Sequence, residues 1–151
     1  MQMLLVMKGV NHQGSGDFAK DIFDMNTHTD VQKIKMVYDG IAYLSNNQMK
    51  ADIVMGMDFA KSTYTFKENA VQINDFAFGF AGSIAMPDES IDIDMSFASK
   101  QNTFKSLISL VPAIFSKEFD KLETSGNILF EGVAKGKYNE TSMPGFKVEL
   151  S

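Results

Sequence analysis

Two aspartates, Asp92 and Asp94, have the spacing that most resembles a catalytic or metal-binding pair. Residues two apart in a strand project from the same face, and paired carboxylates can perform acid–base chemistry or bind calcium. No third acidic residue follows at the loop spacing of a calcium site. We therefore expect both carboxylates on a solvated outer face, opposite Ile91, Ile93 and Met95.

The other residue types that could do chemistry form no recognisable site. His12 and His28 lie in polar segments without the spacing of metal ligands, so we expect both to be exposed. No serine stands in a G-x-S-x-G elbow, and the absence of cysteine excludes disulfides and thiolate nucleophiles. An enzyme would need a cleft that gathers carboxylates such as Asp92, Asp94 and Asp120. We predict a non-enzymatic protein with no catalytic residue, metal or cofactor.

Length and charge restrict the class of protein further. The 151 residues, with 44% hydrophobic and 22% charged side chains, are typical of one globular domain. The net charge is −5, and all 14 basic residues are lysine, so the guanidinium fork that reads phosphate and guanine is missing. We expect no nucleic-acid partner. The N-terminal MQMLLVMKG has no basic n-region, and we expect neither a signal peptide nor a membrane helix in the chain as given.

Alternating apolar residues predict short strands over the first two-thirds of the chain. Asp39-Gly40 between alternating segments is a strong hairpin signal. The polar stretches NHQGSGD, NTHTD and SNNQ are predicted as further turns. The phase of the alternation changes after Ile73, which predicts a bulge near Asn74–Asp75. Turn signals at this spacing indicate a long, curled, mostly antiparallel sheet.

The segment around Phe78 raises a question of function, because neither of its faces is polar. Phe76, Phe78 and Phe80 alternate with Ala77, Gly79 and Ala81. Two apolar faces imply cover on both sides. A helix can cover one face, and either a second sheet or a non-protein apolar ligand must cover the other. The sequence leaves open which of the two sets faces a groove.

A helical period replaces the strand period once. Phe104, Leu107, Ile108 and Val111 recur at helical spacing, and Asn102 or Thr103 can cap the start. Pro112 is expected to kink this helix or to begin a second one. We therefore predict a β-rich α+β domain with a helical hairpin or kinked helix near residues 102–121.

Several segments resemble one protein family. YTFKENAVQIND, GSIAMPDESIDIDMSFAS, FKSLISLVPAIFSKEFDKLETSGN, EGVAKGKYN and MPGFKVEL are similar to the C-terminal region of AsmA-like proteins of the Bacteroidota type. The most specific element is FKSLISLVPAIF, residues 104–115. Members of this family are periplasmic envelope proteins with a membrane anchor and a long groove-shaped β body. They are implicated in outer-membrane assembly and lipid transport.

The resemblance implies a role that the residues alone do not show. The chain would be a single domain, 1–151, belonging to a longer AsmA-like protein of the periplasm or cell envelope. Its partners would be phospholipid or another lipid, together with the rest of the parent chain or other envelope proteins. The candidate lipid-contacting residues are Ile53, Met55, Met57, Phe59, Phe76, Phe78, Phe80, Ile91, Ile93, Met95 and Phe97. The alternative is a self-packed structural or protein-interaction β module of the cell envelope.

Overall fold

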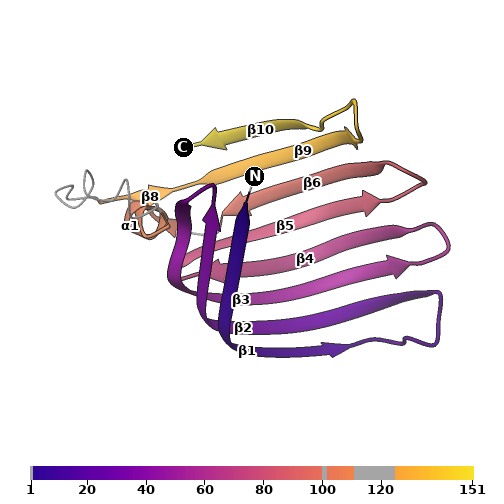
Figure 1. The fold of residues 1–151 in the computed structure, drawn as a ribbon, viewed down its shortest axis with the longest axis horizontal. Helices are drawn as coiled ribbons and strands as arrows, with labels where there is room; N and C mark the ends of the chain where they lie inside the picture. Colours follow the sequence, from indigo (N-terminus) through magenta and orange to yellow (C-terminus); the bar gives the residue numbers. More distant parts are fainter. Residues whose placement is uncertain (1, 100–101, 111–124) are drawn as a thin grey trace.

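Strands account for most of the computed structural model, which describes residues 2–99, 102–110 and 125–151. The strands of the main sheet are β1 (Met3–Ser15), β2 (Ile22–Tyr38), β3 (Ile41–Asp58), β4 (Thr63–Ile73), β5 (Phe76–Ala85), β6 (Ile91–Ser99), β9 (Phe130–Tyr138) and β10 (Gly145–Leu150). They pair in the order β1-β2-β3-β4-β5-β6-β9-β10, and every pair is antiparallel (Figure 1). The predicted large antiparallel sheet is confirmed.

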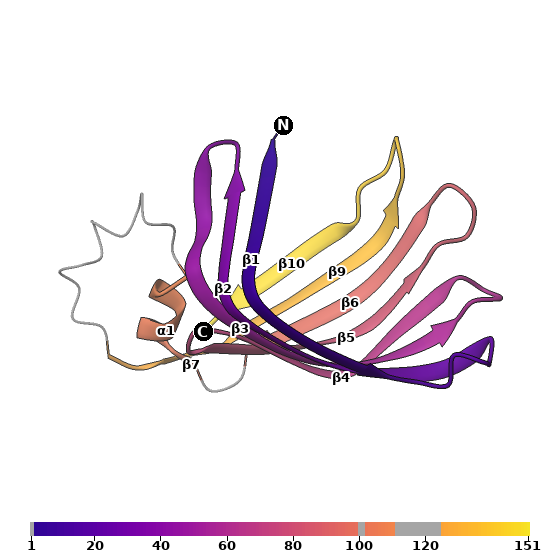
Figure 2. The ribbon, with the colours of Figure 1, turned by 60° about the horizontal axis from the view of Figure 1, so that its bottom comes forward.

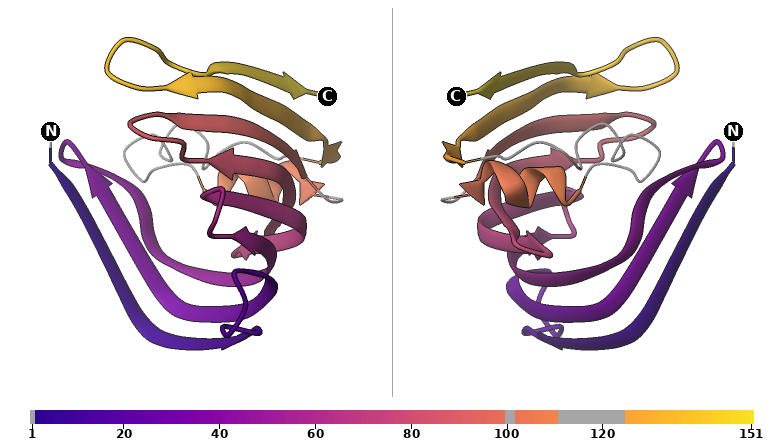
Figure 3. Two further views of the ribbon diagram at one scale, coloured as in Figure 1. Left: turned by 90° about the vertical axis from the view of Figure 1, so that its right-hand side faces the viewer. Right: turned by 90° about the vertical axis from the view of Figure 1, so that its left-hand side faces the viewer.

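The sheet is strongly curled. Figures 2 and 3 show it as an open trough, in which β1–β3 form one wall and β9–β10 form the other. A second, two-stranded sheet of β7 (Asn102–Thr103) and β8 (Asn127–Ile128) lies with the short helix α1 (Phe104–Ile108) at one end of the trough (Figure 1). No second layer covers the main sheet among the described residues.

The buried residues of the main sheet all project from one face. Cross-strand partners in an antiparallel pair point to the same side, so the register assigns each side chain to a face. The buried set is Phe23, Val31, Ile34, Asn47, Ala51, Asn69, Phe76, Met95, Ser99 and Ala134. Side chains on the concave side of a curled sheet converge and shield one another. We therefore call this side the inner face of the trough and the opposite side the outer face.

A sharp bend in the first three strands raises one wall of the trough. The register of β2 against β3 shifts repeatedly between Val31 and Val37, and Gly9 in β1 adopts φ +62°. Val31 and Ile34 are both buried although they are three residues apart, because the strand alternation is interrupted there. The predicted turn SNNQ is wrong. These residues lie within β3, where Asn46 has φ +58° and contributes to the irregular backbone of the bend.

Two hairpin turns of the main sheet lie where the sequence predicted a turn and a bulge. The Asp39-Gly40 turn is confirmed, with φ values of +46° and +81° and with Tyr38 paired to Ile41. The bulge predicted near Asn74–Asp75 is wrong, because these residues form the two-residue turn between β4 and β5.

A bulge does occur, but earlier in the chain, within β4. A register shift between Phe66 and Asn69 lets two residues, Lys67 and Glu68, intervene in β4. Even-numbered residues point inward before the bulge and odd-numbered ones after it. The hairpin turn that follows restores the even phase in β5.

Two other predicted turns, NHQGSGD and NTHTD, are mostly strand. β1 continues through Ser15, and β2 includes all of NTHTD at residues 26–30. Asn26, His28 and Asp30 point to the solvent-exposed outer face. The polar side chains on the inner face form hydrogen bonds there, Thr27 to the Ile53 carbonyl and Thr29 to His12. In this sheet, polarity did not mark the ends of strands.

The helical part of the fold prediction is largely unsupported. The described helix spans only Phe104–Ile108, and Asn102 belongs to β7. Thr103 is the N-cap, as predicted, and its Oγ1 accepts the Ser106 N–H at 3.1 Å. Residues 111–121 of the predicted hairpin or kinked helix lie outside the described residues. The described chain is therefore a β-rich fold rather than an α+β domain.

Candidate functional site

The inner face of the trough brings together almost all of the predicted apolar set. The register places Met55 and Phe66 in one row with Gly82 and Met95, and the next row contains Met57, Tyr64, Ile84 and Ile93. Ten of the eleven candidates lie on this face: Ile53, Met55, Met57, Phe76, Phe78, Phe80, Ile91, Ile93, Met95 and Phe97. The open question of orientation is thereby answered, because Ala77, Gly79 and Ala81 point outward.

Phe59 is the exception among the candidates. It follows the end of β3 and is 51% exposed. Its ring lies 5.8 Å from that of Phe23, which in turn lies 5.1 Å from that of Phe18. These three aromatic rings cluster at the end of the trough where β1 turns into β2, so Phe59 extends the apolar surface without belonging to the sheet.

No described side chain of the inner face carries a formal charge at neutral pH. Across all eight strands, the inward positions are Met, Phe, Ile, Leu, Val, Tyr, Ala and Gly, with a few neutral polar residues. The polar ones are His12, Thr27, Thr29, Asn47, Asn69 and Ser99. Charged side chains are normally frequent on a sheet face that is open to water. Their absence here indicates that the inner face is adapted to an apolar neighbour.

An apolar hollow of about 370 Å³ lies beside the β9–β10 wall. Its lining consists of Phe76, Phe78, Phe97, Phe130, Gly132, Val133, Phe146, Lys147 and Val148. Phe76 is buried, whereas Phe146 and Val148 on the edge strand are 69% and 59% exposed. The hollow therefore extends from the buried part of the inner face to the exposed edge strand β10. An alkyl chain in it would contact aromatic and aliphatic side chains along its length.

Phe66, Phe130, Phe146 and Val148 belong to this surface but were not among the candidates. A usable signal existed for two of them, because GFKVEL alternates Phe146 and Val148 with Lys147 and Glu149. Phe66 was obscured by the bulge, which puts it out of phase with Val71 and Ile73.

The polar groups on the inner face mostly bind backbone rather than facing an open site. At the β4 bulge the ladder to β3 is interrupted, and Asn69 Oδ1 accepts the Val54 N–H at 2.6 Å in its place. Ser99 Oγ accepts the Phe130 N–H at 2.7 Å. Asn69 Nδ2 is buried and has no hydrogen-bond partner among the described residues. These side chains repair breaks in the ladder, and buried polar groups generally need such partners.

Beside the trough, Asn102 connects β7 to β5. It is 2% exposed, its Oδ1 accepts the Ala77 N–H at 2.8 Å, and its Nδ2 donates to the Ala77 carbonyl at 2.7 Å. One amide side chain thus replaces a short stretch of strand pairing.

The outer face carries the charges. Asp94 pairs with Lys135 at 2.7 Å and Asp92 with Lys137 at 3.5 Å, and the four side chains are 46–74% accessible. The prediction of a solvated face for both aspartates is confirmed. Lys67, at the bulge, reaches across Gly56 to Asp24 at 2.5 Å, because glycine leaves the intervening strand without a side chain.

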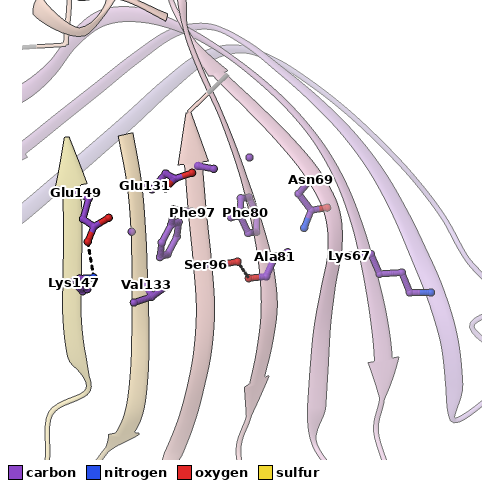
Figure 4. Close-up of a pocket in the computed structure, with 13 residues that line it drawn as sticks. Lys67, Asn69, Phe80, Ala81, Ser96, Phe97, Glu131, Val133, Lys147 and Glu149 are labelled. Carbon is purple, nitrogen blue, oxygen red and sulfur yellow. Dashed lines mark hydrogen bonds and ion pairs between the residues drawn. The ribbon is translucent and has the colours of Figure 1, made fainter. Parts of the chain in front are cut away.

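A shallow hollow of about 650 Å³ also lies on the outer side. Figure 4 shows its lining, with Ala81 and Ser96 in the middle and Lys67 on β4 to one side. Glu131, Lys147 and Glu149 line its other side, on β9 and β10 (Figure 4). The hollow exists because the outward residues of β5 and β6 are small, and its walls bear charges of both signs.

The most concentrated polar cluster on the outer face surrounds His28. Its Nδ1 lies 2.5 Å from Asp52 Oδ1 and its Nε2 lies 2.8 Å from Asp30 Oδ2. Two carboxylate acceptors require two N–H donors, which only the imidazolium form supplies. The hydrogen bond to Asp52, followed by the one to Asp30, raises the pKa of His28 above its ordinary value. The predicted exposure holds in part, since the His28 side chain is 45% accessible.

The described residues contain no group of three or more His, Cys, Asp or Glu side chains placed to hold a metal ion. No helix in this part of the chain has the length and hydropathy needed to cross a bilayer. Asp120 lies outside the described residues, so the three-carboxylate cleft is untested.

Comparisons with protein families, curated proteins and solved structures find no match to this chain. A proposal for the function therefore rests on the chemistry of the two faces and on the sequence resemblance to AsmA-like proteins.

Proposed function

We propose that this chain is a non-enzymatic segment of an AsmA-like envelope protein whose inner face contacts lipid acyl chains during lipid transport or outer-membrane assembly. The observation that carries the proposal is the inner face without a formally charged side chain, in a sheet that has no covering layer among the described residues. Contiguous exposed apolar surface of this kind usually marks a binding site. A periplasmic or cell-envelope location is part of the same proposal and rests on the sequence resemblance.

Composition favours a ligand of variable shape over one fixed partner. Met25, Met36, Met49, Met55 and Met57 all project inward from β2 and β3. Methionine adapts its shape at surfaces that meet varied apolar partners. The phenylalanines of β5 and β6 belong to the same inner face, and their side chains are less flexible than those of the methionines. Alkyl chains of different length and unsaturation suit such a surface.

The first test is native mass spectrometry of protein purified without detergent. Lipid that co-purifies in stoichiometric amount is the expected result. Its absence, together with failure to bind an acyl-chain fluorophore, would contradict the proposal.

A matched pair of variants then locates binding on one face. Phe78→Asp places a carboxylate on the inner face, whereas Ala81→Asp places the same charge on the outer face of the same strand. We expect Phe78→Asp to weaken binding of the fluorophore by about tenfold or more, equivalent to ~1.4 kcal/mol, and Ala81→Asp to leave it unchanged. Circular dichroism of both variants checks that the sheet is retained. Equal binding by the two folded variants would remove the inner face from the proposal.

The alternative function, a protein-interaction module of the cell envelope, is favoured by the edges of the sheet at β1 and β10, beyond which no described strand pairs. Under that alternative, partner protein rather than lipid would cover the trough. Native mass spectra free of lipid, combined with an unchanged fluorophore signal in Phe78→Asp, would support it.

A further inference from the structure

Four hairpin loops lie at one end of the main sheet. They connect β1 to β2, β3 to β4, β5 to β6 and β9 to β10, and Figure 1 shows them at the same ends of their strands. Each loop, or the strand residue next to it, exposes a large apolar side chain. These side chains, which we call the loop patch, are Phe18, Ile22, Phe59, Met86 and Met143, with exposed fractions of 68%, 65%, 51%, 45% and 73%.

The first two loops expose their aromatic rings in the same way. Residues 17–20 and 58–61 both read Asp-Phe-Ala-Lys. Each turn is closed by the lysine N–H, which donates to the Asp17 carbonyl at 3.1 Å in one loop and to Asp58 Oδ1 at 3.0 Å in the other. The same exposure of a phenylalanine therefore occurs twice, although it is unfavourable in water each time. This points to a partner that covers the rings.

Backbone hydrogen bonds join neighbouring loops. The Phe59 N–H donates to the Asp21 carbonyl at 3.1 Å, and the Met86 N–H donates to the Ser62 carbonyl at 2.9 Å. These bonds hold the first three loops together as one surface. A partner would therefore not have to order the loops before binding them.

The loop patch is continuous with the inner face of the trough. The rings of Phe18 and Phe59 both pack on Phe23, which is buried on the inner face. Apolar side chains thus extend from the loops into the surface for which we propose acyl-chain binding. A bilayer in contact with the loops would let an alkyl chain enter the trough without crossing water. The choice of a bilayer over a protein partner rests on that proposed function.

The charges of the loops indicate which kind of bilayer they suit. The four loops contain two lysines, Lys20 and Lys61, and five carboxylates, Asp17, Asp21, Asp88, Glu89 and Glu140. An anionic lipid surface attracts basic segments and repels this acidic excess. A zwitterionic surface lacks that repulsion. On such a surface a lysine can keep its ammonium among the headgroups while its stem lies against apolar groups.

We propose that the loop patch docks the chain on the surface of a zwitterionic lipid bilayer, with Phe18 and Phe59 as its main anchors. The apolar side chains enter the boundary between headgroups and acyl chains, where amphipathic proteins bury aromatic and aliphatic residues. The carboxylates of the loops remain in water.

Cosedimentation with phosphatidylcholine vesicles tests the docking. The wild-type chain should bind, and replacement of half of the lipid by phosphatidylglycerol should weaken binding at low salt. Phe18→Asp should weaken binding by about tenfold or more, because a buried ring is replaced by a charge. Leu4→Asp is the control, since Leu4 is 52% exposed at the far end of β1, and it should bind like wild type.

Three outcomes would overturn the proposal. They are a wild-type chain that does not bind, as for loops that contact protein instead, equal losses in Phe18→Asp and Leu4→Asp, and stronger binding to the anionic vesicles. The acyl-chain fluorophore in vesicle-free solution separates this result from the proposed function. A chain that binds the fluorophore but not vesicles refutes the docking alone, and a chain that binds vesicles through its loops but not the fluorophore refutes acyl-chain binding alone.

Fluorescent labels locate the contact even if a charge at position 18 disturbs folding. The chain contains no cysteine, so Ala19→Cys, Ala60→Cys and Lys8→Cys each supply a single thiol for an environment-sensitive fluorophore. Vesicles should move the emission of the two loop labels toward that of an apolar medium and leave the label at position 8, within β1, unchanged. Equal responses at all three positions, or no response at the loops, would contradict docking through the loop patch.

Discussion

The inner and outer faces of the trough are built from the same strands, yet they follow different rules. In β6, Ile93 and Met95 point into a crowded apolar surface, while Asp94 and Ser96, their neighbours in sequence, point into solvent. The inner face holds the buried residues of the main sheet, and the outer face holds its ion pairs. The comparison shows that a single-layer sheet can obtain a core from curvature, provided that one face is kept free of charge.

The largest expected effect comes from placing a charge on each face in turn. Met95 is 7% exposed, and Met95→Asp should cost more than ~4 kcal/mol of unfolding free energy, because contacts are lost and a carboxylate is left without a partner. Ser96→Asp, one residue along the strand, should change stability by no more than ~0.5 kcal/mol. Urea denaturation of both variants measures the difference. Similar losses would mean that the two faces are not energetically distinct.

Glycine substitutions probe how closely the strands approach. Gly82 has φ +133°, and a Cβ there would lie 2.0 Å from the Asp94 carbonyl oxygen. Gly82→Ala should therefore cost at least ~1–3 kcal/mol, the usual range for backbone strain of this kind. Gly14→Ala is the control, since a Cβ at that position meets nothing nearer than 3.7 Å. Thermal melts that fall equally for the two variants would contradict the special role of Gly82.

Removal of an outer ion pair should have a small effect. Asp94 and Lys135 lie 2.7 Å apart, with side chains 62% and 74% accessible. Asp94→Ala should change the free energy of unfolding by no more than ~0.5 kcal/mol, and high salt should abolish the difference from wild type. A loss above ~2 kcal/mol would place this carboxylate in a buried environment and reverse the assignment of faces.

The smallest effect concerns His28. Its pKa is raised in the folded chain, so its contribution to stability is complete below the unfolded pKa of about 6.5 and is lost as pH rises through the folded value. We expect the imidazole of His28 to titrate above 6.5 in NMR spectra, and Asp52→Asn to lower that pKa more than Asp30→Asn does. A His28 that titrates at its ordinary value would show that the two carboxylates do not hold the ring in solution.

Sequence patterns predicted the sheet and most of the inner face well where the alternation was uninterrupted. Ile53, Met55 and Met57 share one face because β3 is regular there, and Asp39-Gly40 forms its turn because both residues tolerate positive φ. The side of the sheet that Phe78 faces could not be predicted, since Ala77 and Gly79 are also apolar. That choice depends on the curvature of the whole sheet.

The failures have a common physical cause. Polar stretches such as NTHTD were predicted as turns because polarity usually marks loops. In β2 the outer face accepts every second polar side chain, and Thr27 and Thr29 find hydrogen-bond partners on the inner face. The bulge was assigned to Asn74–Asp75 because the phase visibly changes there, while the extra residue lies at Lys67–Glu68. Nothing in the sequence distinguishes a two-residue turn from a bulge when either one accounts for the change of phase.

The order of the strands has a consequence for the route by which this chain folds. Nearly every ladder of the main sheet joins strands that are adjacent in sequence, and only β6 and β9 are separated by other elements. Short loops cost little entropy to close, and proteins dominated by local pairings fold faster than those with distant ones. We expect hairpins to form first and to zip together along the chain. Closure of the β6–β9 ladder, whose strands have the longest stretch of chain between them, would then be the slowest step in completing the trough.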